Sequence, residues 1–207
     1  MPEGRRRIHS PRVLIVEGDD EARFFCGFVD RTVPGKRVQV IAAGGKHSLQ
    51  NNLGAIVKDR GFDKVRWLGI VQDADTDAQS ALQRIQSALT AVRLPFPSDA
   101  WVPTNTDPRV VAIVLPDGSS PGDLEDLLLR VVERDEPSRM KCIDSYFDCL
   151  EVNGVQQPRQ LSKAKAHAYL SSLERPDLQL GVAAQAGLLP LGSRSLDGLR
   201  ELISGQD

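Results

Sequence analysis

The segment Arg12-Val-Leu-Ile-Val-Glu-Gly-Asp-Asp-Glu21 joins a run of aliphatic residues to a cluster of acids. A continuous apolar run of this length is typical of a parallel strand that is covered on both faces. Gly18 then marks a turn, and the phenylalanines that follow lie on one side of a helix expected over about residues 20–31. A strand that leads into a helix is the repeating unit of an α/β fold. The carboxylates at this junction are therefore the first part of a candidate site.

A second acidic stretch, Asp73-Ala-Asp75, follows a second apolar run, Leu68-Gly-Ile-Val71. The carboxyl ends of parallel strands meet at one edge of a sheet, where open α/β folds keep their sites. Carboxylates that converge there repel one another unless a divalent cation neutralises them. In an extended segment the side chains of Asp73 and Asp75 point the same way and could share one ion. The pattern predicts a site for Mg²⁺ (or Mn²⁺) built on Glu17, Asp73 and Asp75.

The rest of the chain repeats the strand-helix unit and then becomes helical. Apolar runs predict strands near residues 12–16, 38–41, 65–71 and 110–115, with helical periodicity between them. After Pro137 only helical periodicity remains. We predict an α/β fold with a mostly parallel, four-stranded, Rossmann-like sheet flanked by helices. We expect residues 1–10 to form a flexible leader, residues 11–135 the α/β domain, and residues 136–207 a helical C-terminal extension packed on it.

Composition narrows the class of protein. The formal net charge of the 207 residues is -2, so no global basic field attracts nucleic acid, and any attraction must be local. Three cysteines without a metal-ligand spacing argue against a disulfide framework or a zinc ribbon. No apolar stretch approaches the roughly twenty residues that a membrane span needs. We expect a soluble, cytoplasmic protein with no membrane partner; the oligomeric state stays open, with a homodimer as one option.

Further candidate residues lie at turns and at helix starts. Ala43-Gly-Gly-Lys46 offers backbone N–H groups and one ammonium to an anionic phosphate, although it lacks the Walker A spacing. Glu21 and Glu125 each fall in the first turn of an expected helix, where they could complete a second metal shell or simply complement the helix dipole. Asp19 or Asp20 could cap the first helix.

These motifs, in this order, resemble the Toprim domain shared by topoisomerases, bacterial primases, small nucleases and the OLD (overcoming lysogenization defect) nucleases. The matching residues are Glu17-Gly-x-x-Glu21, Gly44-Gly-Lys46 and Asp73-x-Asp75, each after a predicted strand, and they place the resemblance over about residues 11–135. Glu21 is similar to the OLD type, where primases and topoisomerases usually have Asp. Gly122-Asp-Leu-Glu-Asp126 also resembles the acidic helix start of the OLD group.

The resemblance implies a nuclease that acts on DNA or RNA with Mg²⁺ (or Mn²⁺). Glu17 would be a metal ligand or general base, Asp73 and Asp75 the principal ligands, and Glu21 and Glu125 the ligands of a second ion. Basic residues would stabilise negative charge in the transition state; the candidates are Lys46, Lys163 and Lys165. Both tyrosines fall inside expected helices of the C-terminal region, so water is the preferred nucleophile and hydrolysis the expected reaction.

Two other interpretations stay open. The chain could be a catalytically weak Toprim module that works with a separately encoded ABC-like ATPase, as OLD-type domains do, often in phage defence. It could also be a phosphotransfer receiver, because Arg12–Val16 followed by Asp19-Asp20 resembles the opening strand and acidic pair of that family. Gly18 interrupts the receiver pattern, and no late strand ends in Lys-Pro. For Lys163 and Lys165 a solvated helix surface is the alternative.

Overall fold

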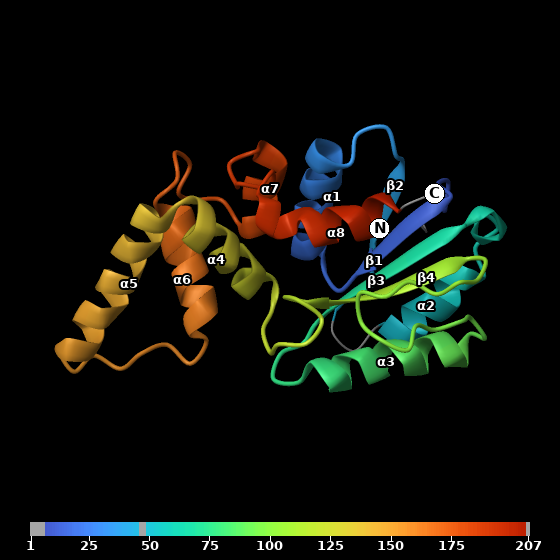
Figure 1. Ribbon diagram of the computed structural model, residues 1–207, viewed down its shortest axis with the longest axis horizontal. Coiled ribbons are helices and arrows are strands. Elements are labelled where there is room, and N and C mark those ends of the chain that lie inside the picture. The colour runs from blue at the N-terminus through green and yellow to red at the C-terminus, as the bar shows by residue number, and fades with distance from the viewer. Residues whose placement is uncertain (1–6, 46–48, 206–207) are drawn as a thin grey trace, which may run out of the picture.

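The fold is an α/β structure in which helices cover both faces of one sheet (Figure 1). The computed structural model describes residues 7–45 and 49–205. In chain order the elements are β1 (Arg12–Val16), α1 (Asp19–Thr32), β2 (Val38–Ala42), α2 (Leu49–Val57), the short 3₁₀ helix η1 (Phe62–Lys64), β3 (Trp67–Asp73), α3 (Ala78–Ala91), β4 (Arg109–Leu115), α4 (Leu124–Asp135), α5 (Pro137–Val152), α6 (Leu161–Ser171), α7 (Leu180–Ala186), the 3₁₀ helix η2 (Arg194–Leu196) and α8 (Asp197–Ser204).

The sheet has four parallel strands in the order β2-β1-β3-β4, which confirms the predicted α/β class and the four-stranded sheet. Arg12 pairs with Val38 on one side and with Trp67 on the other, so β1 lies between β2 and β3. The chain therefore leaves β1 toward one edge of the sheet and returns to its other side with β3. A crevice forms outside the carboxyl ends of the strands at such a reversal, and ligands of open α/β folds bind there.

Alternate residues of each strand enter two separate hydrophobic clusters. Leu14 and Val71 belong to the cluster that α1, α4 and the C-terminal helices cover. Ile15 and Ile70 belong to the cluster that α2 and α3 cover on the opposite face (Figure 1). This alternation follows from the two-residue period of a strand, and burial on both faces explains why the strands read as continuous apolar runs.

The proline-containing segment between α3 and β4 protects the edge of the sheet. The backbone N–H of Trp101 donates to the carbonyl of Ala112, and that of Thr104 donates to the carbonyl of Val110, each at 2.8 Å. These bonds satisfy groups of β4 that an open edge strand would leave available to other chains.

The C-terminal helices form an arm and then return to the sheet. α5 and α6 project from the body, whereas α7 packs on α1 (Figure 1) and the carbonyl of Ile203 in α8 accepts a hydrogen bond from Arg12 of β1. Gly27 of α1 and Gly181 of α7 permit the return, because a Cβ atom at either position would lie under 3 Å from the backbone of the other helix. Ala183 and Leu199 consequently join the same hydrophobic cluster as β1. Across residues 7–45 and 49–205, no helix combines the length and apolar composition that a membrane crossing needs.

Candidate functional site

Carboxylates from separate elements meet at the carboxyl ends of β1 and β3, an arrangement that we call the acidic edge. It consists of Glu17, Glu21, Asp73, Asp123 and Glu125. Glu17 follows the last residue of β1, and Asp73 is the last residue of β3, the strand beside it. Residues two apart in β3 share a face, so Asp73 points to the same side as Val71, the side covered by α1 and α4.

Glu21 reaches the acidic edge because the preceding turn has no side chain. Gly18 is the N-cap of α1, and a Cβ atom there would lie only 2.7 Å from Oε2 of Glu21. The Glu21 carboxylate therefore folds back over Gly18, beside Glu17. Its own place in the first turn of α1 also sets it in the favourable field of the helix dipole.

Asp123 and Glu125 arrive from the start of α4. Asp123 is the N-cap of that helix, and it forms a capping box with Asp126: each side chain accepts a hydrogen bond from the other's backbone N–H, at 3.1 and 3.0 Å. The box fixes the first turn of α4 and holds the Asp123 carboxylate in place. Asp123 was not among the predicted site residues, although it lies in the acidic helix start that resembles the OLD group and from which only Glu125 was selected.

Lys163 of α6 faces this cluster and carries its counter-charge. Its Nζ atom lies 3.1 Å from Oε1 of Glu125 and 3.5 Å from Oδ2 of Asp123. Burial disfavours the charge of Lys163, but Glu125, Asp123 and Asp73 together raise its pKa above the ordinary value. The predicted basic residue and the predicted acidic residues therefore lie together, although more than thirty residues separate them in the sequence.

Asp73 is the most strongly perturbed acid of the acidic edge. Burial raises the pKa of Asp73 to about 8, and the negative charges of Asp123, Glu17, Glu21 and Glu125 add to the shift in that order. Burial and Asp123 also raise the pKa of Glu125, against the opposing effect of Lys163. Such a shift measures how strongly neighbouring charges resist a further negative charge at Asp73. The Asp73 side chain therefore favours binding a proton or a cation over remaining an unpaired negative charge.

The prediction that Asp73 and Asp75 point the same way from an extended segment is wrong. Asp75 has a φ of 54°, and its backbone exchanges two hydrogen bonds with Gly122 at 2.9 and 2.8 Å. The left-handed residue turns the chain, and the carboxylate of Asp75 lies 3.9 Å from Nη2 of Arg84. Asp75 also lines the groove that contains Asp123. Asp73 and Asp75 therefore belong to adjoining but different surroundings.

The remaining predicted residues lie outside the acidic edge or outside the described chain. Lys165 pairs with Asp144 of α5 at 2.6 Å and lines a groove beside the acidic edge. Lys46 lies outside the described residues. The predicted capping by Asp19 or Asp20 is wrong: α1 begins at Gly18 without a side-chain cap, and Asp20 instead accepts a hydrogen bond from the N–H of Gly181 at the start of α7.

The side chains of the acidic edge are of the type that binds a hard divalent cation, although they lie too far apart to form a closed set of ligands. All of the candidate ligands are carboxylate oxygens, which Mg²⁺ and Mn²⁺ prefer. Within the described parts of the chain, no three acidic, histidine or cysteine side chains are close enough to make a ready-formed cage. Lys163 gives a physical reason, because its ion pairs draw Asp123 and Glu125 toward α6. An entering cation would also meet Glu17, Glu21 and Asp73.

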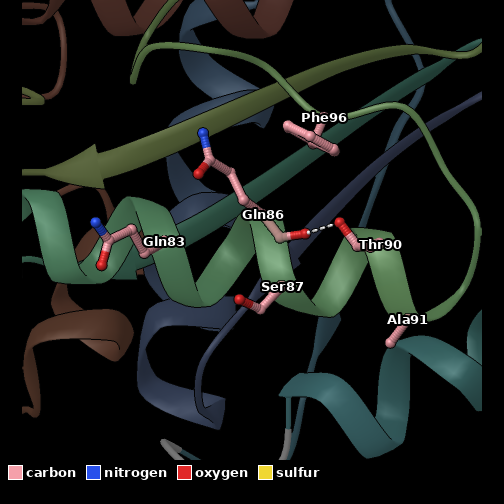
Figure 2. A pocket seen from close by; sticks show the side chains of 6 residues that line it. All are labelled: Gln83, Gln86, Ser87, Thr90, Ala91 and Phe96. Atoms are coloured by element: carbon pink, nitrogen blue, oxygen red, sulfur yellow. Dashed lines mark hydrogen bonds between the residues drawn. The ribbon is translucent and has the colours of Figure 1, made fainter.

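One cavity lies beside the acidic edge, and two others lie along α3. A groove of about 580 Å³ runs between the start of α4 and the start of α6, with Asp75, Asp123, Arg159 and Lys165 along it. A second, of about 460 Å³, lies on the opposite face of the sheet and contains Gln72 and Arg84. Figure 2 shows the third, about 620 Å³, on the outer face of α3, where the residues between Gln83 and Phe96 that line it carry no charged side chain.

Comparison with known proteins gives a family and no activity. The model of the family described as "Protein of unknown function (DUF3226)" matches residues 11–202. The chain belongs to this family. The match spans the sheet, the acidic edge and α6, the helix that carries Lys163. The matched residues therefore include every element of the candidate site. No curated protein and no solved structure matches the chain.

Proposed function

We propose that the chain is a Toprim-like, Mg²⁺- or Mn²⁺-dependent nuclease that hydrolyses phosphodiester bonds in DNA or RNA. The observation that carries this proposal is the raised pKa of Asp73 at the carboxyl ends of β1 and β3. Carboxylates from several elements surround it, and a half-buried acid under such repulsion favours a divalent cation in place of its proton. When bound, the metal would neutralise charge at the scissile phosphate and activate water.

The side chains around the acidic edge suit the remaining requirements of phosphodiester hydrolysis. Glu17 and Asp73 would hold the cation, with Glu21 beside them. Lys163 already points at the carboxylates and would stabilise negative charge on the phosphate once the cation takes over Asp123 and Glu125. The adjoining groove carries Arg159 and Lys165 beside its aspartates, and these two bases are the local cations that a phosphate backbone would meet there.

A water nucleophile is favoured over a tyrosine. Tyr169 is buried, and its hydroxyl donates to Oε1 of Glu136 at 3.0 Å, away from the acidic edge. Burial raises the pKa of Tyr169, and the negative charge of Glu136 raises it further. Tyr146 lies exposed on the arm formed by α5 and α6. Hydrolysis is therefore proposed, with no covalent enzyme intermediate.

The second candidate function is the partner-dependent Toprim module, and the arm formed by α5 and α6 favours it. Tyr146 and Val152 of α5 are 56% and 86% exposed, so the outer face of the arm offers apolar side chains that the chain itself does not cover. A separately encoded ABC-like ATPase is the partner that this proposal names. Activity would then require both proteins.

The receiver interpretation has less support. A receiver needs its early acidic pair beside the aspartate at the end of the third strand. Here Asp20 bonds to Gly181 of α7, and neither Asp19 nor Asp20 is among the charges that raise the pKa of Asp73. Glu17 and Glu21 occupy that position instead.

A cleavage assay tests the proposal. The purified chain is incubated with supercoiled plasmid, single-stranded DNA and structured RNA in Mg²⁺, in Mn²⁺ and in EDTA. We expect metal-dependent cleavage that Asp73→Asn lowers at least about 100-fold, because one ligand and one charge are lost. Asp148→Asn, an exposed acid on α5, is the matched control and should retain activity. Equal cleavage by wild type and Asp73→Asn would overturn the metal assignment; cleavage only after addition of an ATPase partner would favour the second candidate.

A further inference from the structure

A polar cavity lies next to the acidic edge, on the other face of the sheet. We call it the Gln72 pocket, after a residue that lines it. Gln72 precedes Asp73 in β3, so its side chain points toward α2 and α3. The cavity has a volume of about 460 Å³, within the range of small-molecule sites.

Gln72, which lines the pocket, has an amide oxygen without a hydrogen-bond partner among the described residues. The residue is 3% exposed. A buried acceptor that stays unpaired costs about 1–3 kcal/mol, so few are kept without a reason. The apolar side chains of Leu49 and Ala88 also line the pocket. A ligand that fits must therefore bring a flat apolar surface and a hydrogen-bond donor on its edge.

The rim of the pocket connects it to the acidic edge. Arg84 lines the pocket, while its Nη2 atom lies 3.5 Å from the carbonyl oxygen of Asp73 and 3.9 Å from Oδ2 of Asp75. Ser87 and Gln83 supply neutral polar groups on the same rim. One guanidinium therefore connects the rim of the pocket with the acids at the end of β3.

We propose that the Gln72 pocket binds the base of the nucleotide beside the scissile bond, and that it prefers adenine; this rests on the proposed nuclease function. The glutamine amide matches adenine, because Oε1 accepts from the N6 amino group while Nε2 donates to N7. Arg84 contacts the phosphate of the same nucleotide. The base is read while unstacked, so the substrate is single-stranded at that position.

The outer face of α3 continues this binding surface. The cavity in Figure 2 shares Gln83 and Ser87 with the Gln72 pocket and ends at Phe96, which is 49% exposed. Gln86 holds the segment that carries Phe96, since its Nε2 atom donates to the carbonyl of Pro97 at 2.9 Å. An exposed aromatic ring beside neutral polar groups is the surface on which a neighbouring base stacks.

Calorimetric titration of the whole chain with nucleotides tests the proposal without requiring cleavage. AMP, CMP, GMP, UMP, adenosine and inorganic phosphate are the probes, in buffer with EDTA. We expect AMP to bind most tightly of the nucleotides, and Gln72→Leu to weaken it about tenfold or more, as loss of a paired amide contact predicts. Gln79→Leu, an exposed glutamine on α3 outside the pocket, is the matched control.

A second variant keeps the test independent of the folding of Gln72→Leu. Arg84 is exposed, and Arg84→Met should weaken AMP but leave adenosine binding intact, because only the phosphate contact is removed. Equal affinity for AMP and UMP, or for AMP and inorganic phosphate, would overturn the proposal, as would unchanged AMP binding in Gln72→Leu. Nucleotide binding without any cleavage would reject only the nuclease function, and cleavage without AMP binding would reject only the pocket.

Discussion

Gln72 and Asp73 are adjacent in β3, yet they belong to two regions with opposite chemistry. Asp73 enters the acidic edge, where burial and several negative charges raise its pKa and Lys163 offers the counter-charge. Gln72 enters a neutral pocket on the other face of the sheet, where its amide oxygen has no partner. The alternation of a strand places the two residues back to back. One strand end can therefore serve a charged reaction centre and a neutral recognition pocket, with Arg84 between them.

Beyond changes to Asp73 itself, removal of the Lys163 charge should lower the cleavage rate most among the changes at the acidic edge. Lys163→Met keeps most of the side-chain volume but removes the cation that faces Glu125 and Asp123. We expect cleavage to fall about 100-fold, as for loss of one group that stabilises transition-state charge. Steady-state assays in Mn²⁺ measure the change. Lys141→Met, an exposed lysine on α5, is the control, and equal losses in the two variants would contradict a role for Lys163 at the acidic edge.

The stability of the metal-free chain should fall as the pH rises, because of Asp73. The unfolded chain ionises this group near 3.8, whereas the folded chain keeps the proton until about pH 8. Between these values the folded state binds more protons, so the free energy of unfolding decreases with rising pH and levels off above about 8. Urea unfolding in EDTA at several pH values measures the slope. Asp73→Asn should flatten it and raise the unfolding temperature at pH 8 by about 4–8 °C, the equivalent of about 2 kcal/mol.

Mn²⁺ gives the complementary test of the same carboxylate. Because the cation competes with the proton on Asp73, Mn²⁺ should raise the unfolding temperature more at pH 8 than at pH 5. An equal rise at both values, or an equal rise in Asp73→Asn, would mean that the cation binds elsewhere.

Two substitutions at Asp123 separate its charge from its role as a cap. Asparagine caps helices about as well as aspartate, whereas alanine loses the cap and costs about 1 kcal/mol. Asp123→Asn should therefore lower the pKa of Asp73 with little loss of stability, since Asp123 is the largest charge acting on it. Asp123→Ala should lower both the pKa of Asp73 and the free energy of unfolding. Urea unfolding measures the stability of the two variants, and NMR titration of the Asp73 carboxyl measures its pKa. Equal stability of Asp123→Asn and Asp123→Ala would contradict the capping box.

Gly18→Ala should change the stability least of these substitutions, but it should weaken the binding of Mn²⁺ at the acidic edge. The backbone at residue 18 (φ -130°) accepts alanine, but the new Cβ atom would lie 2.7 Å from Oε2 of Glu21 and displace that flexible side chain. We expect the free energy of unfolding to change by less than about 0.5 kcal/mol. The affinity for Mn²⁺, measured by calorimetry, should fall about threefold. Gly192→Ala, where a Cβ atom meets nothing within 4 Å, is the control.

The sheet could be predicted from the sequence because its signals are local. Apolar runs such as Val13 to Val16 are continuous where a strand is buried on both faces, and each is followed by a helix with its own apolar stripe. The parallel order follows from these alternating units. Glu17 and Asp73 could be selected for the same reason, since a residue that follows a buried strand lies at the carboxyl edge wherever the other strands fall.

The composition of the site depended on contacts between distant segments. Asp75 departs from the extended path of β3, and its backbone pairs with Gly122, almost fifty residues later. Asp123 joins the edge although only Glu125 was selected from that helix start, and Asp20, whose local pattern indicates a cap, instead bonds to Gly181 of α7. No short stretch of sequence carries information about these partners.

The sequence alone determined the α/β class and named four acids of the edge, Glu17, Glu21, Asp73 and Glu125, because strand ends and helix starts can be recognised from neighbouring residues. Only the tertiary structure decided which charges meet Asp73, that Lys163 faces them, and that Gln72 lies unpaired in a pocket behind them. The physical reason is that electrostatic interaction and burial depend on distance in space, which chain topology sets and local propensity does not.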